Sequence, residues 1–275
     1  MSSAGEDQWL DATLDGVLGG QPTENISISQ PDIGLEAAYA LQGKLVSKLQ
    51  GHGGWGKLLG YKAALTALPA QQAMGIDEPI VGALFAQQAY SALTPDATDP
   101  GAPLSITADR PILLETELGF SLSKTITAPV QVENVFDVID TCCGMIELAA
   151  PNLQQRPSSV DLVASNSASY GCIAAASAMA PGQLDLDELT ITLVRQHDGA
   201  GGEEDQVLHS ARAGSVMGSQ RQALAWLINT LLARGYELQT GHILMTGSIG
   251  NMHPGAPGSY RADFGPLGEL VLAVV

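Results

Sequence analysis

PILLETELGFSL, residues 111–122, places two glutamates, Glu115 and Glu117, two positions apart in a run that is otherwise almost wholly apolar. Side chains alternate between the two faces of a β-strand, so both glutamates would share one face. If that face meets water, the strand is an ordinary amphipathic one. If it is buried, the two carboxylates repel each other and need a cation, and Mg²⁺ or Mn²⁺ suits them because carboxylates are hard ligands. The stretch alone leaves both interpretations open.

The composition is that of an ordinary globular protein. The chain has 275 residues, 45% of them hydrophobic and 15% charged, which favours one large domain or one domain with a small companion. Its 29 acidic and 12 basic residues give a formal net charge of −17. No nucleic-acid partner is therefore expected, since such partners need clustered Lys and Arg. An anionic substrate would need a local cation or a bound metal ion to enter a site on this protein.

We expect a cytoplasmic protein with no membrane partner. The first residues, MSSAGEDQWL, lack the basic and apolar regions of a signal peptide, and no run of about 20 apolar residues could span a bilayer. The three cysteines, an odd number without CxxC spacing, argue against a disulfide framework and a structural zinc site. Buried free thiols are expected instead.

Hydrophobic spacing predicts both helices and strands. Helices are expected at 6–19, 34–50, 69–74 and 220–235, and the segment 132–150 has helical spacing in its first half. Strands are expected at 111–121, at 189–196 paired with 206–214, and in the last stretches ILMTGSIG and GELVLAVV. Because the strands and helices do not alternate regularly, the pattern predicts an α+β fold. No GxGxxG or GxxxxGKS motif supports a nucleotide site.

Three further charged residues are candidates for a site. Glu147, alone between GMI and LAAP, could complete a metal site or face solvent near a helix end. Lys62, in the apolar run LLGYKAALT, either extends its ammonium to water or is held near a site as a base or anion anchor. Asp77 in GIDEP could make a turn before Pro79 or act in the site. The histidines form no HxxxH or HExxH pair, and no GxSxG motif supports a hydrolase triad.

Several stretches occur in an order that resembles a known family. They are GYKAALT (60–66), QAMGIDEPIVGALF (72–85), LLETELGF (113–120), Glu147, DLVASNSASYG (161–171) and WLINTLLARGYELQTGHILMTGSIG (226–250). From about residue 35 to the C-terminus, the chain resembles the 2-keto-4-pentenoate (2-hydroxypentadienoate) hydratase and 4-oxalocrotonate decarboxylase family of the fumarylacetoacetate hydrolase superfamily. The ordered set is specific for the family, whereas no single stretch is.

The resemblance implies a fold and a set of site residues. The fold is α+β, with a distorted, mixed β-barrel-like roll at 76–275, a smaller N-terminal α/β portion at 1–75, and assembly into homo-oligomers. The implied Mg²⁺ or Mn²⁺ ligands are Glu115, Glu117 and Glu147. The implied acid/base or orienting groups are Lys62 and Asp77, and the implied substrate-pocket residues are Leu84, Asn166 and Ser169.

The implied activity is hydration of a 2-hydroxy-2,4-dienoate, the enol of a 2-keto-4-enoate, to a 4-hydroxy-2-oxo acid in aromatic meta-cleavage catabolism. Decarboxylation of a 4-oxalocrotonate-type 2-oxo-enedioate is the alternative, because both reactions need the same enolate. A non-catalytic partner subunit, or a complex with a pathway decarboxylase or aldolase, is also open. A carbon–carbon hydrolase is disfavoured, since we find no histidine–glutamate pair that would activate water. The chain departs from the family pattern at His242, at Ser219 and Gln220 and in the loop 251–260, which leaves the far end of the substrate undetermined.

Overall fold

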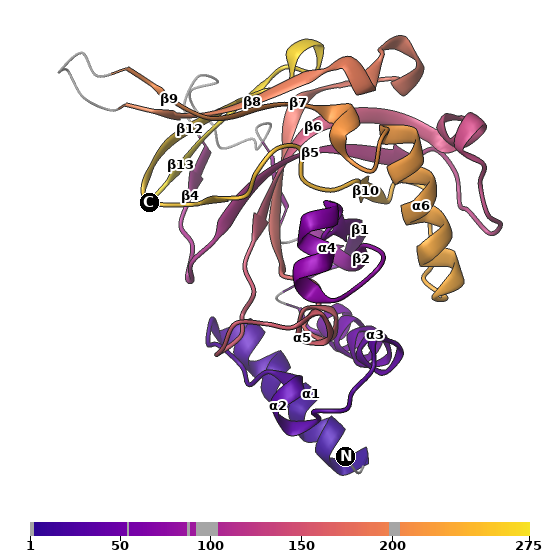
Figure 1. Ribbon diagram of the computed structural model, residues 1–275, viewed down its shortest axis with the longest axis vertical. Coiled ribbons are helices and arrows are strands. Elements are labelled where there is room, and N and C mark those ends of the chain that lie inside the picture. The colour runs from indigo at the N-terminus through magenta and orange to yellow at the C-terminus, as the bar shows by residue number, and fades with distance from the viewer. Residues whose placement is uncertain (1–2, 54, 87–88, 92–103, 198–203) are drawn as a thin grey trace.

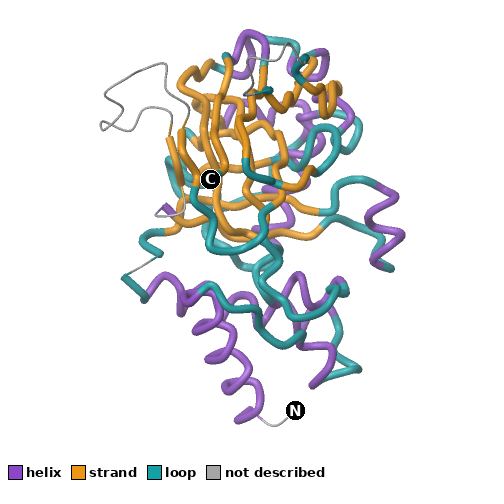
Figure 2. The backbone as a smooth tube through the Cα atoms, turned by 90° about the vertical axis from the view of Figure 1, so that its left-hand side faces the viewer, coloured by secondary structure: helices purple, strands orange, loops and turns teal. Residues whose placement is uncertain are grey.

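The computed structural model describes residues 3–53, 55–86, 89–91, 104–197 and 204–275. Two β-sheets fill one end of the molecule, and helices from the N-terminal part of the chain gather at the other end (Figures 1 and 2). The α-helices are α1 (Ser3–Gly19), α2 (Ile26–Ser29), α3 (Leu35–Gly51), α4 (Leu68–Met74), α5 (Ser159–Ala164) and α6 (Gln220–Ala233).

The larger sheet carries the glutamates. Its strands are β1 (Leu58–Ala64), β2 (Ile80–Phe85), β3 (Ala89–Ser91), β5 (Leu113–Leu122), β6 (Ile139–Ala149), β7 (Ser169–Met179), β10 (Ile243–Met245) and β11 (His253–Pro254). The order is β2-β1-β10-β5-β6-β7-β3, with β11 pairing beside β10 on β5. Strands β1 and β10 are parallel, as are β3 and β7, while the other pairs are antiparallel. Strands β5 and β6 therefore lie in the middle of the sheet.

The smaller sheet has the order β4-β13-β12-β8-β9. Its strands are β4 (Leu104–Ile106), β8 (Thr190–Gln196), β9 (Gln206–Arg212), β12 (Gly258–Asp263) and β13 (Glu269–Val274). The predicted pairing of 189–196 with 206–214 is confirmed by the antiparallel β8–β9 ladder. Since β4 runs parallel to β13, this sheet is mixed as well. The α+β class is thus confirmed, whereas the expected barrel-like closure is not, because in the described residues both strand orders are open at their ends.

The predicted helices form for the local reasons that the sequence suggests. Helix α4 begins with Pro69 in its first turn and ends at Gly75, whose φ of 64° is the left-handed conformation that glycine tolerates. Helix α6 begins after Ser219, whose side chain accepts a hydrogen bond from the backbone N–H of Gln222. Helix α1 covers the predicted range 6–19, and α3 lies one residue later than the predicted range 34–50 at both ends.

The segment 132–150 differs from its predicted helical character. Only Val132–Val138 is helical, as a 3-10 helix, and the remainder is the long strand β6. Strand β6 pairs with β5 on one side and β7 on the other, and its second half is buried on both faces. The sequence of such a strand is a continuous apolar run, and the spacing of its hydrophobic residues cannot distinguish it from a buried helix. Glu147 consequently lies within a central strand and not near a helix end.

The helical layer combines segments that are distant in the sequence. Helix α5 packs against α3 and α2, although more than 100 residues separate it from each of them. Asp161 on α5 accepts hydrogen bonds from the backbone and side chain of Ser27 at 2.9 Å each. Strand β1, from the N-terminal portion expected at 1–75, is a member of the large sheet, so the division at residue 75 stays a prediction. Among the described helices, none is long and apolar enough to cross a membrane.

A buried chain of polar side chains joins the two sheets. Thr116 on β5 donates its hydroxyl proton to the carbonyl of Ile249 at 2.9 Å, and its Oγ1 lies 3.0 Å from Nε2 of His209 on β9. Nδ1 of His209 lies 3.0 Å from Nε2 of His253 on β11. Burial, and then the charge of the adjacent His253, together lower the pKa of His209 to about 4. In neutral His209, Nε2–H can donate a hydrogen bond to the Thr116 hydroxyl while Nδ1 accepts one from His253. In protonated His209, Nδ1 also carries a proton, so it would point a donor at His253.

The neutral state of His209 predicts a loss of stability on acidification. Because its folded pKa of about 4 lies below the ordinary value of 6.5, stability is fully present above pH 6.5 and falls as the pH drops toward 4. Between pH 7.5 and pH 5 this residue should account for about 2 kcal/mol of lost unfolding free energy. Urea unfolding of the wild type and of His209→Gln at both pH values tests this, since the titrations of groups that do not contact His209 cancel in the comparison. An equal stability difference at the two pH values would contradict the prediction.

Candidate metal centre and active site

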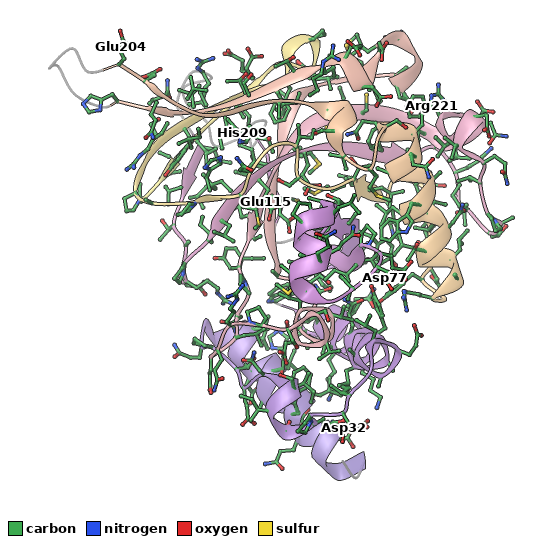
Figure 3. The ribbon with its side chains drawn as sticks, in the orientation of Figure 1. Asp32, Asp77, Glu115, Glu204, His209 and Arg221 are labelled. Carbon is green, nitrogen blue, oxygen red and sulfur yellow. The ribbon has the colours of Figure 1, made fainter. Side chains whose placement is uncertain are left out.

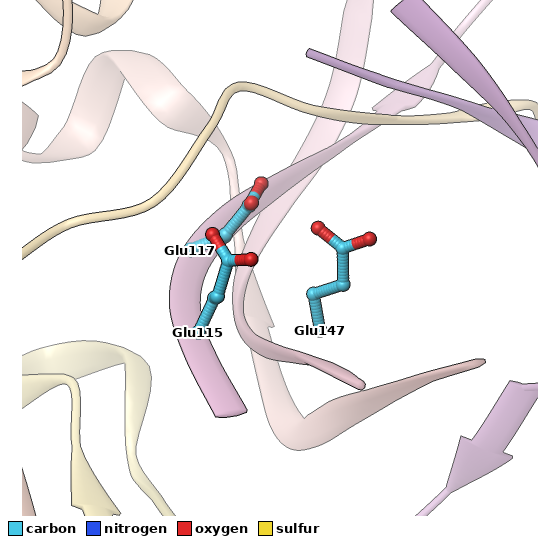
Figure 4. A group of neighbouring side chains, drawn as sticks. All are labelled: Glu115, Glu117 and Glu147. Carbon is cyan, nitrogen blue, oxygen red and sulfur yellow. The ribbon is translucent and has the colours of Figure 1, made fainter. Parts of the chain in front are cut away.

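Three carboxylates converge on one face of the large sheet. Glu115 and Glu117 come from β5, and Glu147 lies directly opposite Glu115 on β6. Each contributes an oxygen within 4.8 Å of the other two, and Figure 4 shows Glu147 facing the β5 pair. Glu117 and Glu147 have 0% and 1% of their surfaces exposed, while Glu115 is partly exposed. The predicted strand with two glutamates on one face is confirmed, and that face points into the protein and not to solvent.

The inward direction follows from the place of β5 in the sheet. The opposite face of the strand, formed by Leu114, Thr116, Leu118 and Phe120, has 0% exposure throughout. Both faces of the strand are therefore covered. Because β5 is hydrogen-bonded on both sides, its backbone polar groups are satisfied and the chain can keep it in the interior.

Lys62 is the cation of this cluster. Its Nζ lies 2.6 Å from Oε1 of Glu147, and its side chain is 2% exposed, so it does not extend to water. Strand β1 directs the side chain to the same face as the glutamates, with Gly82 and Met245 opposite it on the neighbouring strands. Burial by itself would lower the pKa of Lys62, but the charge of Glu147, followed by that of Glu115, raises it above its ordinary value. The ammonium form is therefore the resident state.

The carboxylates are costly to ionise together. Burial raises the pKa of Glu115 to about 7, with Glu147 adding to the effect and Lys62 opposing it. Burial and then the charge of Glu147 raise the pKa of Glu117 well above its ordinary value. The pKa of Glu147 is raised by burial as well, against the opposing charge of Lys62. Three carboxylates and one ammonium leave two excess negative charges, which equals the charge of one divalent cation.

The Glu117 carboxylate has one oxygen with neither a hydrogen-bond partner nor an ion-pair partner in the described residues. Oε2 of Glu117 accepts a hydrogen bond from the backbone N–H of Gly247 at 2.8 Å, whereas Oε1 is buried without a hydrogen-bond partner in the described residues. Gly247 adopts a φ of 112°, and a Cβ there would lie 2.4 Å from the Thr66 side chain, so only glycine brings its N–H to Glu117 without strain. The donor set of hard oxygens with excess negative charge fits Mg²⁺ or Mn²⁺.

A left-handed turn holds strand β2 beside the cluster. Asn166, Ser167 and Ala168 all have φ between 54° and 68°, a conformation that costs non-glycine residues energy. The Asn166 amide accepts from the Ala83 N–H at 2.7 Å and donates to the Ala83 carbonyl at 3.0 Å. The turn therefore replaces a neighbouring strand along the edge of β2. It also leaves the Ser169 hydroxyl buried without a hydrogen-bond partner in the described residues.

A fumarylacetoacetate hydrolase C-terminal family model matches residues 55–270. The chain belongs to the fumarylacetoacetate hydrolase family. One similar curated relative is the 2-oxo-hept-4-ene-1,7-dioate hydratase of Escherichia coli, which is 28% identical over 256 residues, or 89% of this chain and 88% of the relative. Another is a 2-keto-4-pentenoate hydratase of Paraburkholderia xenovorans, which is 27% identical over 241 residues, or 87% of this chain and 83% of the relative. The structure of 4-oxalocrotonate decarboxylase from Pseudomonas putida G7, complexed with magnesium and adipate, has a TM-score of 0.87 at 19% identity and covers 100% of this chain and 99% of that one.

Not every residue that the family resemblance assigns to the site lies near the carboxylates. Asp77 is exposed on the turn before β2, and Figure 3 shows it well away from Glu115. Asn166 uses both polar atoms of its side chain on the backbone of Ala83, so within this protomer it positions β2. Leu84 and Ser169 border the cluster, since both line a small cavity of about 10 Å³ together with Cys172, which lies opposite Glu147. The catalytic and substrate-binding assignments stay predictions.

Two departures from the family pattern have structural explanations away from the glutamates. Ser219 is the cap of α6, and Gln220 donates to the carbonyl of Ala213 at 2.6 Å. His242 lies against Tyr61, with the ring centroids 5.8 Å apart. Because Tyr61 and Lys62 are neighbours in β1, their side chains point to opposite faces. His242 is therefore on the other side of the sheet from the carboxylates.

A second cleft, of about 860 Å³, also lies on the Tyr61 side of β1 and is lined by Tyr39, Tyr236 and Arg234 among others. The guanidinium of Arg234 is already paired with Glu36 at 3.1 Å and stacks on Tyr39 at 3.5 Å. This cleft is larger than the space at the carboxylates, but none of the metal-cluster residues lines it. We place the candidate site of this family member at the carboxylates because the buried, uncompensated charge is there.

Apart from Leu84, sequence reasoning missed the apolar residues that adjoin the carboxylates. Leu84, Met145, Cys172 and Met245 form a buried cluster on the same face of the sheet. The three cysteines are free, with Cys142 and Cys172 buried and Cys143 partly buried, as expected. Only the strand register reveals that Cys172 faces Glu147. No local signal in the sequence indicates that pairing, because β6 and β7 are joined by a long connection.

Proposed function

We propose that the protein is a metal-dependent hydratase that converts a 2-hydroxy-2,4-dienoate into a 4-hydroxy-2-oxo acid. The observation that carries the proposal is the buried cluster of Glu115, Glu117 and Glu147, with Lys62 as its one ion-paired cation in the described residues. The names of the curated relatives, which include several hydratases of this class, support the same reaction. A role in aromatic meta-cleavage catabolism, in the cytoplasm, belongs to the proposal.

Glu115, Glu117 and Glu147 would hold Mg²⁺ or Mn²⁺ there, and the ion would supply Lewis-acid stabilisation of negative charge at the C2 oxygen of the substrate. The reaction needs two proton transfers and one addition. The enol proton leaves and C5 gains a proton, which gives a 2-oxo-3-enoate. Water then adds its oxygen to C4 and C3 gains a proton, so the sum is the addition of one water molecule.

The side chains of the protein would control the protons and the water. The Nζ of Lys62 carries a proton inside the cluster, 2.6 Å from Glu147, and can deliver it to a substrate carbon as a general acid. The Gly247 N–H fixes one oxygen of Glu117, so this carboxylate keeps its direction during the reaction. Burial of Lys62, Glu117 and Glu147 excludes bulk water from the reacting atoms.

The finer assignments belong to the same proposal. The hydroxyl of Ser169 lacks a partner and could hold the attacking water, Leu84 could contact the substrate chain, and Asn166 could orient β2. Asp77 would act as an acid/base or orienting group only if substrate binding or a neighbouring subunit brought it to the site. A homo-oligomer and a complex with a pathway decarboxylase or aldolase are further parts of the proposal.

The test uses the metal-stripped protein with and without Mg²⁺ or Mn²⁺. The substrates are enzymatically generated 2-hydroxypenta-2,4-dienoate and 4-oxalocrotonate, followed by ultraviolet absorbance and by CO₂ release. We expect metal-dependent loss of the dienoate without CO₂. Release of CO₂ from the dicarboxylate would favour the decarboxylase alternative, and no reaction of the purified chain with either compound would favour a partner role.

A further inference from the structure

An apolar surface adjoins the carboxylates on the same face of the large sheet. Leu84, Met145, Cys172 and Met245, each at most 3% exposed, form one buried cluster, which we call the sulfur-rich wall. The methionine side chains are unbranched and polarisable, so they can adjust to a ligand of irregular shape. The wall is therefore adaptable although it is closely packed.

The strand register places the wall against the charged residues. Met145 lies directly opposite Glu117, Cys172 opposite Glu147, and Met245 opposite Lys62. Residues opposite each other in a sheet have Cβ atoms about 5 Å apart. A ligand held at the carboxylates would meet the wall within one or two carbon–carbon bonds.

A glycine on β5 makes room for the wall. A Cβ at Gly119 would lie 2.1 Å from Sδ of Met145, so the absence of a side chain there lets the methionine lie flat against the strand. Gly119 lies opposite Met245 on β10 as well. Along one face of β5, the sequence Glu-Thr-Glu-Leu-Gly thus changes from two carboxylates to a glycine that is covered by the Met145 side chain.

The Lys and Arg residues nearest the wall are already paired. All 12 Lys and Arg residues of the chain fall within the described ranges, and Lys62 is the one in the buried core. Its charge is already offset by three carboxylates. Arg110, whose side chain is 8% exposed and stacks on Tyr170, is paired with Asp109 at 2.7 Å. A second carboxylate of a ligand would lie in this wall without a partner, and an unpaired buried charge is strongly unfavourable.

We propose that the sulfur-rich wall binds the far end of the substrate and selects an uncharged, alkyl-terminated 2-oxo or 2-hydroxy-dienoic acid over a dicarboxylate. The inference rests on the proposed function, because the carboxylate and C2 oxygen of the substrate must be held at the glutamate cluster for its tail to reach the wall. It assigns this chain to the monocarboxylate members of the substrate class.

Binding of stable 2-oxo acids tests the inference without turnover. Titration calorimetry of the Mg²⁺-loaded wild type would compare pyruvate, 2-oxohexanoate and 2-oxoadipate, the last two having equal chain length. Each methylene from pyruvate to 2-oxohexanoate should tighten binding by up to about fourfold. 2-Oxoadipate should bind about a hundredfold more weakly than 2-oxohexanoate.

A variant locates the effect at the wall. Leu84→Ala should weaken 2-oxohexanoate binding about tenfold and leave pyruvate binding within about twofold, because pyruvate does not reach the removed side chain. Leu193→Ala, which removes an equally buried leucine from β8 in the other sheet, is the matched control and should leave the ratio of the two affinities unchanged.

The outcomes separate the two proposals. If 2-oxoadipate binds as tightly as 2-oxohexanoate, the wall does not select against charge and this inference is overturned, while the proposed hydratase stands. If Leu84→Ala weakens both acids equally, the wall does not contact the tail, which also overturns the inference. If none of the three acids binds in the presence of Mg²⁺, the proposed function falls and the inference falls with it. The wild-type series is decisive even if Leu84→Ala does not fold.

Discussion

Glu117→Gln is expected to lower metal-dependent hydration by at least about 10³-fold, since loss of several kcal/mol of charge stabilisation corresponds to a factor of ten per 1.36 kcal/mol. Glu117 is the most completely buried of the three carboxylates, and its Oε1 has no hydrogen-bond partner in the described residues. Glutamine keeps the shape and can still accept from the Gly247 N–H, so the variant removes the charge and replaces the partnerless oxygen by an NH₂ group that cannot bind a metal ion. Rates at saturating Mg²⁺, with Mn²⁺ affinity by calorimetry as a second readout, measure the effect.

The same variant should stabilise the metal-free protein. Burial and the neighbouring carboxylates raise the pKa of Glu117 in the folded protein. Ionisation of Glu117 therefore lowers the stability of the folded protein as the pH rises above the ordinary pKa of a glutamate. The melting temperature of metal-free Glu117→Gln should exceed that of the wild type, with a larger gain at pH 8 than at pH 6. Glu133→Gln, at an exposed glutamate, is the control. Unchanged metal affinity together with lower stability in Glu117→Gln would refute a metal centre at this residue.

The fold was predictable where one local pattern decides the structure. Helix α6 has an apolar face, a serine cap and a glycine after its end, and these signals act within a few residues. Strand β6 was not predictable as a strand because it is apolar on both faces, and its pairing with β5 and β7 is a long-range property. The two-sheet arrangement likewise depends on contacts such as His209 with Thr116, 93 residues apart.

The candidate site was predictable in part. Two-residue spacing places Glu115 and Glu117 on one face, but spacing could not decide whether that face is buried. Its apolar context made Glu147 a candidate and the ordered motifs added it to the ligand set, but its place opposite Glu115 follows from the β5–β6 register, which has no local signal. The exposed position of Asp77 and the left-handed turn at Asn166 depend on how β2 is held at the edge of the sheet. Neither has a signal in the local sequence.

Lys62→Met is expected to lower the unfolding free energy of the metal-free protein by about 3–5 kcal/mol, because removing one partner of a buried ion pair leaves an uncompensated charge. Nζ of Lys62 lies 2.6 Å from Glu147, and both side chains are at most 2% exposed. The folded pKa of Glu147 is already raised by burial and loses the opposing charge of Lys62 in the variant. The deficit should therefore grow as the pH rises, since ionisation of Glu147 then costs more in the folded than in the unfolded protein.

The double variant Lys62→Met/Glu147→Gln decides whether charge or packing causes the loss. If charge is the cause, the second substitution should recover most of the stability lost in Lys62→Met, and urea unfolding of all four proteins in the cycle would give a coupling energy of about 2–3 kcal/mol. Lys124→Met, at an exposed lysine, should stay within about 0.5 kcal/mol of the wild type. A double variant as unstable as Lys62→Met alone would mean that the methylene chain of Lys62 matters, and not its pairing with Glu147. Because unfolding is measured without metal or substrate, this result would bear on the electrostatic basis of the site even if the proposed reaction were wrong.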